Sequence, residues 1–165
     1  MASILIAVAA VLCSFSASAT EFVNFDEPYR PGTVIIKAPT RELFFVYEPG
    51  RAVRYRVAVP KKGKEWSGYT HVKSKLISPA WSPPKDVKAN NPHLPDYIPG
   101  GAPSNPMGAR AIMLTRHEIA IHGTTAKMRK SIGSASSCGC VRMRNEDIID
   151  LFDRVKVGTP VVMVH

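Results

Sequence analysis

A proline-rich segment from Ser78 to Pro106 limits the fold of this chain more than any other feature. It reads SPAWSPPKDVKANNPHLPDYIPGGAPSNP and holds more than half of the chain's 14 prolines. Proline fixes φ and lacks an N–H donor, so the segment cannot form a long helix or a central strand. We expect a long ordered loop, because loops of this length in compact domains usually serve as lids or flaps. The loop contains apolar side chains that can anchor it on the domain: Trp81, Leu94, Tyr97 and Ile98.

Patterns typical of β-strands occur on both sides of this segment. Before it, ELFFVYE and RAVRYRVAV are joined by Pro49 and Gly50, which predicts a β-hairpin. In the second run, Tyr55 and several valines alternate with Arg54 and Arg56, as a half-buried strand requires. Further strands are expected within residues 33–37, 66–77, 109–114, 118–123 and 160–164.

One segment near the end of the chain has the spacing of an amphipathic helix. In NEDIIDLFDRV, apolar side chains recur at helical intervals: Ile148, Leu151, Phe152 and Val155. Asn145 is expected to cap this helix, and the acidic residues that follow suit the positive end of the helix dipole. The sequence therefore predicts a mainly β fold with one short helix and a long Pro-rich loop.

At 165 residues and 18.0 kDa, the chain is expected to form one domain behind an export signal. The first 19 residues contain no charged side chain, and their apolar run ends in the small residues Ala17, Ser18 and Ala19. This A-x-A pattern predicts a signal peptide at 1–19, cleaved after Ala19, and a mature domain at 20–165. A membrane anchor is the alternative, but the apolar run is shorter than the ~20 residues that cross a bilayer. We expect no membrane span after cleavage.

The formal net charge of +9 lies on the mature domain, because the leader carries no charge. A strongly basic surface attracts polyanions. Nucleic acid is not an expected partner, because the chain is exported and has no basic stripe interleaved with aromatic residues. Binding to an anionic envelope surface and plain solubility are both compatible with the charge.

Signal cleavage would leave two cysteines, Cys138 and Cys140, separated by Gly139. They are too few and too close to form a disulfide framework, so the thiols must have a different role. Cys140 is a candidate nucleophile, with His122 at the end of a predicted strand as its base. Gly139 would let the backbone turn sharply, so that N–H groups of residues 138–140 stabilise an oxyanion. Arg142 could bind a substrate carboxylate through its planar fork.

Three alternative roles for these thiols stay open on the residues alone. Cys140 could be a buried structural thiol, could form a disulfide with Cys138, or could bind a metal together with Cys138 and His122. A Gly/Ser-rich turn is a poor place to bury a thiol, and a C-x-C disulfide closes a strained ring. Metal sites normally have wider spacing and a fourth ligand. These arguments favour the nucleophile without deciding the question.

The segment IHGTTAKMRKSIGSASSCGCVRMRNEDIIDLF resembles the active-site signature of the YkuD-type L,D-transpeptidase family. That signature runs H-G-T, then I-G, then S-x-G-C-[IV]-R-M-x-N-x-D. Upstream, WSGYTHV, WSPP, LPDYIPGG and NPMGARA also resemble exported Gram-negative members, so the likeness extends from about Thr33 to Val164. The resemblance implies a β-sandwich or barrel-like catalytic domain at 20–165, located in the periplasm, that needs no cofactor and no metal.

The resemblance also implies roles for individual residues. Cys140 matches the nucleophile, His122 matches the general base, and Gly123 matches the position whose carbonyl orients the imidazole. The oxyanion and substrate-binding positions are matched by Ser137, Cys138, Gly139 and Arg142. The cysteine at position 138 departs from the family, which commonly has His or Ser there. The remaining histidines lie outside the signature and are expected to have surface or structural roles: His71, His93, His117 and His165.

A chain of this kind is expected to transfer acyl groups of peptidoglycan. The cysteine would be acylated by a tetrapeptide stem and released to an amine acceptor, either a diaminopimelate side chain in cross-linking or a lipoprotein lysine in attachment. One alternative is hydrolysis, as an L,D-carboxypeptidase or a lipoprotein-detaching sibling. Another is a catalytically silent wall-binding module in which a bridge between Cys138 and Cys140 blocks the thiol.

Overall fold

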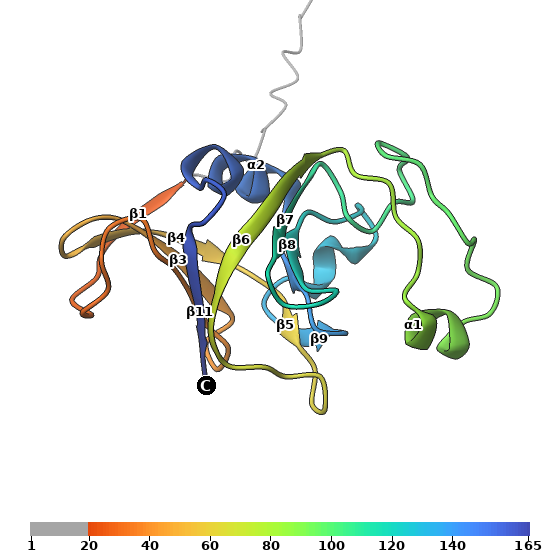
Figure 1. Cartoon of the computed structure of the whole chain (residues 1–165), viewed down its shortest axis with the longest axis horizontal. Helices are drawn as coiled ribbons and strands as arrows, with labels where there is room; N and C mark the ends of the chain where they lie inside the picture. Colours follow the sequence, from red (N-terminus) through yellow and green to blue (C-terminus); the bar gives the residue numbers. More distant parts are fainter. Residues whose placement is uncertain (1–19) are drawn as a thin grey trace, which may run out of the picture.

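The computed structural model describes residues 20–165 of the protein (Figure 1). The signal peptide predicted at residues 1–19 lies outside the described residues. Within the described range, no helix is long and apolar enough to cross a membrane.

Short strands make up most of the regular structure. They are β1 Glu21–Asn24, β2 Val34–Lys37, β3 Glu42–Glu48, β4 Arg51–Arg56, β5 Val59–Pro60, β6 Gly68–Ile77, β7 Arg110–Leu114, β8 Ala120–His122, β9 Ala135–Ser137, β10 Val141–Arg142 and β11 Pro160–Val164. The helical segments are α1 Lys85–Asn90, the 3-10 helix η1 Met128–Ser131 and α2 Asn145–Arg154. The predicted fold class, mainly β with a short helix after Cys140, is confirmed.

Most of these strands join one large sheet in the order β1-β4-β3-β2-β11-β6-β7-β8-β10, while β5 pairs with β9 separately. The predicted hairpin is present, because β3 and β4 pair antiparallel across Pro49 and Gly50. β11 lies parallel to β2 and antiparallel to the first part of β6, so it joins the two halves of the sheet.

Strand β6 belongs to both halves of the sheet. Its first residues pair with β11, and from Val72 onward it pairs with β7. The register shifts between Val72 and Ser74, and an irregularity of this kind bends a strand. Figure 1 shows β6 running diagonally between the group of β3, β4 and β11 and the group of β7 and β8. This course places β8, which bears a predicted site residue, beside the main core.

Strands β2 and β3 are buried on both faces. In β2, Val34 and Ile36 belong to the main hydrophobic cluster, whereas Ile35 belongs to a second cluster. β3 divides in the same way, with Leu43 in the main cluster and Phe44 in the second. Burial on both faces explains why these two strands are continuous apolar runs rather than alternating ones.

Helix α2 covers part of the main cluster. Its buried side chains are Ile148, Leu151 and Phe152. The helix begins at Asn145, but its N-cap position is Arg144, so the prediction of Asn145 as the cap is wrong by one residue. The Asn145 side chain instead bonds to backbone groups of two other segments.

The proline-rich segment forms the expected loop and contains the short helix α1. Its two arms meet where Trp81 and Ile98 exchange backbone hydrogen bonds of 2.9 and 2.8 Å. The Asn105 side chain closes the base of the loop by donating to three backbone carbonyls. Ile98 is buried and Leu94 is half-buried, but Tyr97 is exposed, so the prediction of Tyr97 as an anchor is wrong. The adjacent Ile98 fills the position where the loop contacts the domain.

Several short elements do not follow from the sequence pattern. β9 and β10 lie in the segment that reads as a Gly/Ser-rich turn, and β1 lies directly after the leader. These strands contain between two and four residues each, so they show no detectable period.

Candidate active site

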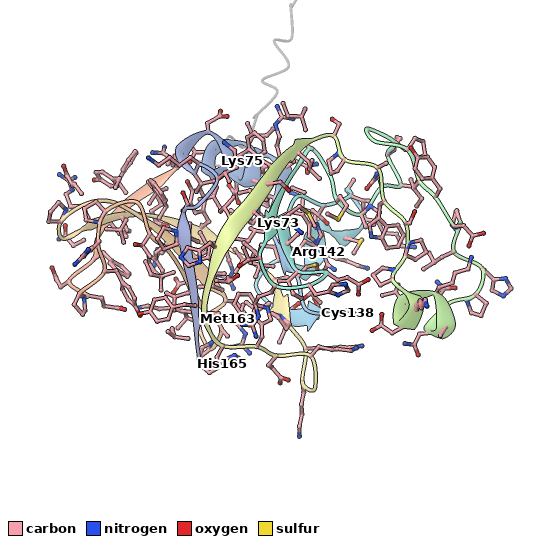
Figure 2. The ribbon with its side chains drawn as sticks, in the orientation of Figure 1. Lys73, Lys75, Cys138, Arg142, Met163 and His165 are labelled. Atoms are coloured by element: carbon pink, nitrogen blue, oxygen red, sulfur yellow. The ribbon has the colours of Figure 1, made fainter. Side chains whose placement is uncertain are left out.

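A pocket of about 510 Å³ lies between the proline-rich loop and the segment that follows β8. The loop supplies one wall, which includes Trp81, Asp86 and Ile98. The other wall contains five of the residues that the sequence predicts for the site: His122, Ser137, Cys138, Cys140 and Arg142. Figure 2 shows Cys138 and Arg142 on the same side of β6 as α1.

Parallel pairing of β8 with β10 brings the histidine toward the cysteine. Arg142 pairs with His122, and the Met143 N–H donates to the His122 carbonyl at 2.8 Å. Cys140 directly precedes β10 and therefore enters the pocket beside the end of β8. The long chain segment between His122 and Cys140 is taken up by η1 and β9.

His122 is buried and uncharged near neutral pH. The residue is 5% exposed, and its Nδ1 lies 2.7 Å from the Gly123 carbonyl oxygen. Burial is the largest cause that lowers the pKa of His122 from 6.5 to about 4, and the positive charge of Arg142 is the second. Hydrogen bonding to the backbone of Gly123 and Pro106 raises this pKa but offsets only part of the effect. Since a carbonyl can only accept, we infer that Nδ1 bears the proton and Nε2 is the basic nitrogen.

The Cys140 thiol lies against the backbone at the start of β8. Its sulfur is 3.6 Å from the Glu118 carbonyl oxygen. Burial raises the pKa of Cys140, and the Ala120 backbone and the Arg142 charge offset only part of this effect. With a raised thiol pKa and a lowered imidazole pKa, the resting pair is thiol and neutral imidazole rather than thiolate and imidazolium.

Residues 137–140 form a tight turn whose shape requires Gly139. Gly139 has a φ of +125°, a conformation that L side chains rarely adopt, so backbone strain favours glycine there; the Cβ of another residue would also push aside the tip of the Ile119 side chain. The Ser137 hydroxyl donates to the Cys140 carbonyl. No hydrogen bond within residues 20–165 uses the N–H groups of Cys138, Gly139 or Cys140. The turn therefore holds unused donors beside the thiol.

Arg142 is a buried cation without a counter-ion. The residue is 9% exposed, and its Nη1 donates to the Ser131 hydroxyl at 2.7 Å. In the described part of the chain, Arg142 Nε has no hydrogen-bond partner and none of the ion pairs involves Arg142. A buried charge is costly unless it is paired. The guanidinium is therefore suited to bind an anionic group that enters the pocket.

Asn145 connects two segments beside the pocket, a role that the sequence reasoning missed. Its side-chain oxygen accepts from the N–H groups of Ala109 at 3.0 Å and Thr124 at 3.1 Å, and its Nδ2 donates to the Thr124 carbonyl at 2.9 Å. A Cβ at Gly123 would lie 2.3 Å from that oxygen, so glycine is needed there for space. Asn145 thus fixes the backbone that follows His122. Its place in the R-M-x-N part of the signature is the signal that could have identified it.

The other histidines differ in position. His117 lies at the pocket with a largely exposed side chain, and His165 Nε2 lies 2.8 Å from the Trp66 carbonyl oxygen. His71 and His93 are exposed. Among the residues that the structure describes, no group of three or more His, Cys, Asp or Glu side chains is arranged to hold a metal ion.

Residues 31–163 match the family model of YkuD, the L,D-transpeptidase catalytic domain, and this range includes every residue that lines the pocket. Among curated proteins, the probable L,D-transpeptidase ErfK/SrfK of Escherichia coli strain K12 is 35% identical over 141 residues. The match covers 82% of this chain and 44% of that protein, so the chain spans less than half the length of this relative.

Two solved structures illustrate the structural likeness. A Brucella melitensis protein described as a probable carnitine operon oxidoreductase is 39% identical, with a TM-score of 0.58 over 84% of this chain and 89% of that chain. L,D-transpeptidase 3 of Mycobacterium tuberculosis, in complex with a faropenem-derived adduct, is 13% identical, with a TM-score of 0.59 over 81% and 60% of the two chains. The Brucella description names a different kind of enzyme, whereas the family model matches most of this chain. The chain belongs to the family of L,D-transpeptidase catalytic domains.

Proposed function

We propose that this chain is a cysteine acyltransferase that acts on peptidoglycan stem peptides as an L,D-transpeptidase. The Cys140 sulfur attacks the carbonyl carbon of the bond between an L-centre and the terminal D-amino acid of a tetrapeptide stem. The D-amino acid leaves with the proton that the thiol gives up, and the acyl group remains on Cys140 as a thioester. An amine then attacks the thioester and restores the thiol. The observation that supports this most directly is the pocket shared by Cys140, His122 and Arg142.

His122 serves as the general base in this proposal. The raised pKa of Cys140 and the lowered pKa of His122 keep the proton on sulfur at rest, so it moves to the imidazole only as the sulfur attacks. The Gly123 carbonyl accepts from Nδ1, which leaves Nε2 free to receive that proton. The same nitrogen then returns the proton to the leaving amine.

The unused N–H groups of residues 138–140 form the oxyanion hole. A preorganised donor of this kind typically contributes about 3–4 kcal/mol to the stability of the transition state. Only the backbone of Cys138 is needed, so the change from the family's His or Ser leaves this role intact. Ser137 supports the turn by bonding to the Cys140 carbonyl.

Arg142 binds a carboxylate of the donor stem. The side chain lines the pocket, is buried and has an unsatisfied Nε, so a carboxylate would supply both the missing acceptor and the missing charge. The chain's net charge of +9 also favours contact with anionic wall polymers.

The acceptor is a primary amine, on a diaminopimelate side chain in cross-linking or on a lipoprotein lysine in attachment. These substrates occur in the periplasm, where a signal peptide at 1–19 would deliver the catalytic domain at 20–165. The reaction as written uses no cofactor. The relatives' names as L,D-transpeptidases support this choice of substrate class.

Muropeptides with tetrapeptide stems test the proposal. The reduced protein, mixed with these donors and an excess of a diaminopimelate-containing acceptor, should release D-amino acid and form the amine-linked product in equal amounts by mass spectrometry. Released D-amino acid without that product would identify a hydrolytic L,D-carboxypeptidase instead. No release from folded protein with two titratable thiols would contradict catalysis. Protein recovered without reductant that has no titratable thiol would support the wall-binding module.

A further inference from the structure

Trp66 contacts the backbone of the turn that contains Cys140, although it lies outside the pocket. The residue is 8% exposed and belongs to the main hydrophobic cluster. Its indole Nε1 donates a hydrogen bond of 2.9 Å to the Gly139 carbonyl oxygen. Trp66 is not among the residues that line the pocket. The hydrogen bond to the Gly139 backbone is therefore the most direct route by which this side chain can affect the reaction.

The peptide group between Gly139 and Cys140 can transmit such an effect. A trans peptide is planar, and its C=O and N–H point in opposite directions. The peptide bonds of residues 20–165 include no cis bond. By holding the Gly139 carbonyl on the core side, the indole turns the Cys140 N–H to the opposite side of the turn, away from the core. Glycine has wide conformational freedom, so without this bond the peptide plane would be less well fixed.

Trp66 is itself held firmly. The Arg116 guanidinium carbon lies 4.9 Å from the centre of its ring, and His165 Nε2 lies 2.8 Å from its carbonyl oxygen. The Ser137 hydroxyl fixes the far end of Cys140 by donating to its carbonyl. The Cys140 N–H is thus oriented by an indole donor before it and a hydroxyl donor after it.

We propose that Trp66 is a positioning residue for the oxyanion hole, whose indole N–H fixes the Gly139–Cys140 peptide plane and so aims the Cys140 N–H at the substrate oxygen. This inference rests on the proposed acyl transfer by Cys140. It implies a selective defect when the indole N–H is lost. Reactions of Cys140 that pass through an oxyanion become slower, whereas reactions of the same thiol without an oxyanion keep their rate.

Trp66→Phe provides the test, because it keeps a buried aromatic ring and removes the donor. Two reactions of Cys140 are timed: acylation by imipenem, which passes through a tetrahedral oxyanion, and alkylation by iodoacetamide, a direct displacement at carbon. Mass spectrometry of peptide 131–142 separates Cys140 from Cys138. Acylation should slow by about 10-fold or more, while alkylation keeps its rate and its pH profile. Phe44→Leu, which removes a buried ring from the second cluster, should change neither reaction.

The possible outcomes separate this inference from the proposed function. Unchanged acylation in Trp66→Phe would overturn the inference, and so would an equal slowing of both reactions, because that would indicate a general disturbance of the turn. If Trp66→Phe does not fold, site-specific replacement of the indole by benzothiophene, which has the same shape but no N–H, applies the same criteria. A wild-type protein that is alkylated at Cys140 but never acylated would instead contradict the proposed function.

Discussion

At the scale of single residues, the candidate site contains two basic side chains, His122 and Arg142, whose pKa values are lowered by burial. The charge of Arg142 lowers the pKa of His122 further. The two residues pair across β8 and β10, and this register places the Arg142 charge near the imidazole of His122. We expect two consequences: a stability that depends on pH, and binding at the proposed anion site that depends on the shape of the Arg142 guanidinium.

The free energy of unfolding should fall as His122 is forced to take up a proton. Its pKa is about 4 in the folded protein, against 6.5 as its ordinary value. The unfolded chain therefore binds the proton first, and stability present above pH 6.5 is lost as the pH falls toward 4. The loss attributable to His122 should reach roughly 3 kcal/mol, measured by urea denaturation at several pH values. In His122→Gln the slope over this window should flatten, and an unchanged slope would contradict the buried neutral imidazole.

Arg142→Lys should lower turnover of muropeptides by about 10-fold or more, because lysine keeps the charge but lacks the bidentate fork. Folding should change little, which the thermal midpoint would check. Arg51→Lys is a matched control, since Arg51 is exposed and its guanidinium contacts only Glu48 and the ring of Tyr47 at the surface of the described structure. Full activity of Arg142→Lys would remove this residue from the binding site.

At the scale of elements, the sequence predicts strands and helices that have a period and fails where an element is too short to show one. The β3–β4 hairpin, β11 and α2 all follow from apolar spacing and turn residues. β9 and β10 do not, although β10 brings Cys140 toward His122 by pairing with β8. The prediction that Cys140 and His122 lie close together therefore rests on the family signature and not on the local sequence pattern. Trp66 and Asn145 were missed because their hydrogen bonds reach backbone atoms far away in the sequence.

Asn145→Ala should destabilise the domain by about 2–4 kcal/mol, because it leaves the N–H groups of Ala109 and Thr124 and the Thr124 carbonyl without their partner. Urea denaturation would measure this loss. Asn90→Ala in α1 is the control, since its amide makes one exposed hydrogen bond. A loss below about 1 kcal/mol for Asn145→Ala would show that this contact does not hold the segments together.

At the scale of the whole molecule, contacts of the sheet, the proline-rich loop and the C-terminal residue connect the segments around the pocket. β11 joins the halves of the sheet, and the residue after it, His165, bonds to Trp66, whose indole contacts the turn at residues 137–140. The proline-rich loop closes the other side, and the exposed pair of Lys64 and Asp86 at 2.6 Å connects the loop to the segment after β5. The sequence predicts the proline-rich loop, but not that this loop forms one wall of the pocket.

The mature protein should begin at Thr20, because the charge-free leader ends in the A-x-A pattern at Ala19. N-terminal sequencing of protein recovered from the cell envelope would measure this. β1 begins at Glu21, so cleavage at this point would leave the described fold intact. Retention of Met1 on the envelope protein would contradict the predicted signal peptide.

The identity of Cys140 as the nucleophile is tested most directly by intact-protein mass after exposure to a carbapenem. Wild type should gain the mass of one acyl adduct. Cys140→Ser should gain none, whereas Cys138→Ser should still be acylated, because serine supplies the same backbone N–H at that position. All three proteins are measured with and without reductant, so that any bridge between the two thiols is opened. An adduct on Cys140→Ser, or the absence of one on folded and reduced Cys138→Ser, would contradict the assignment of Cys140.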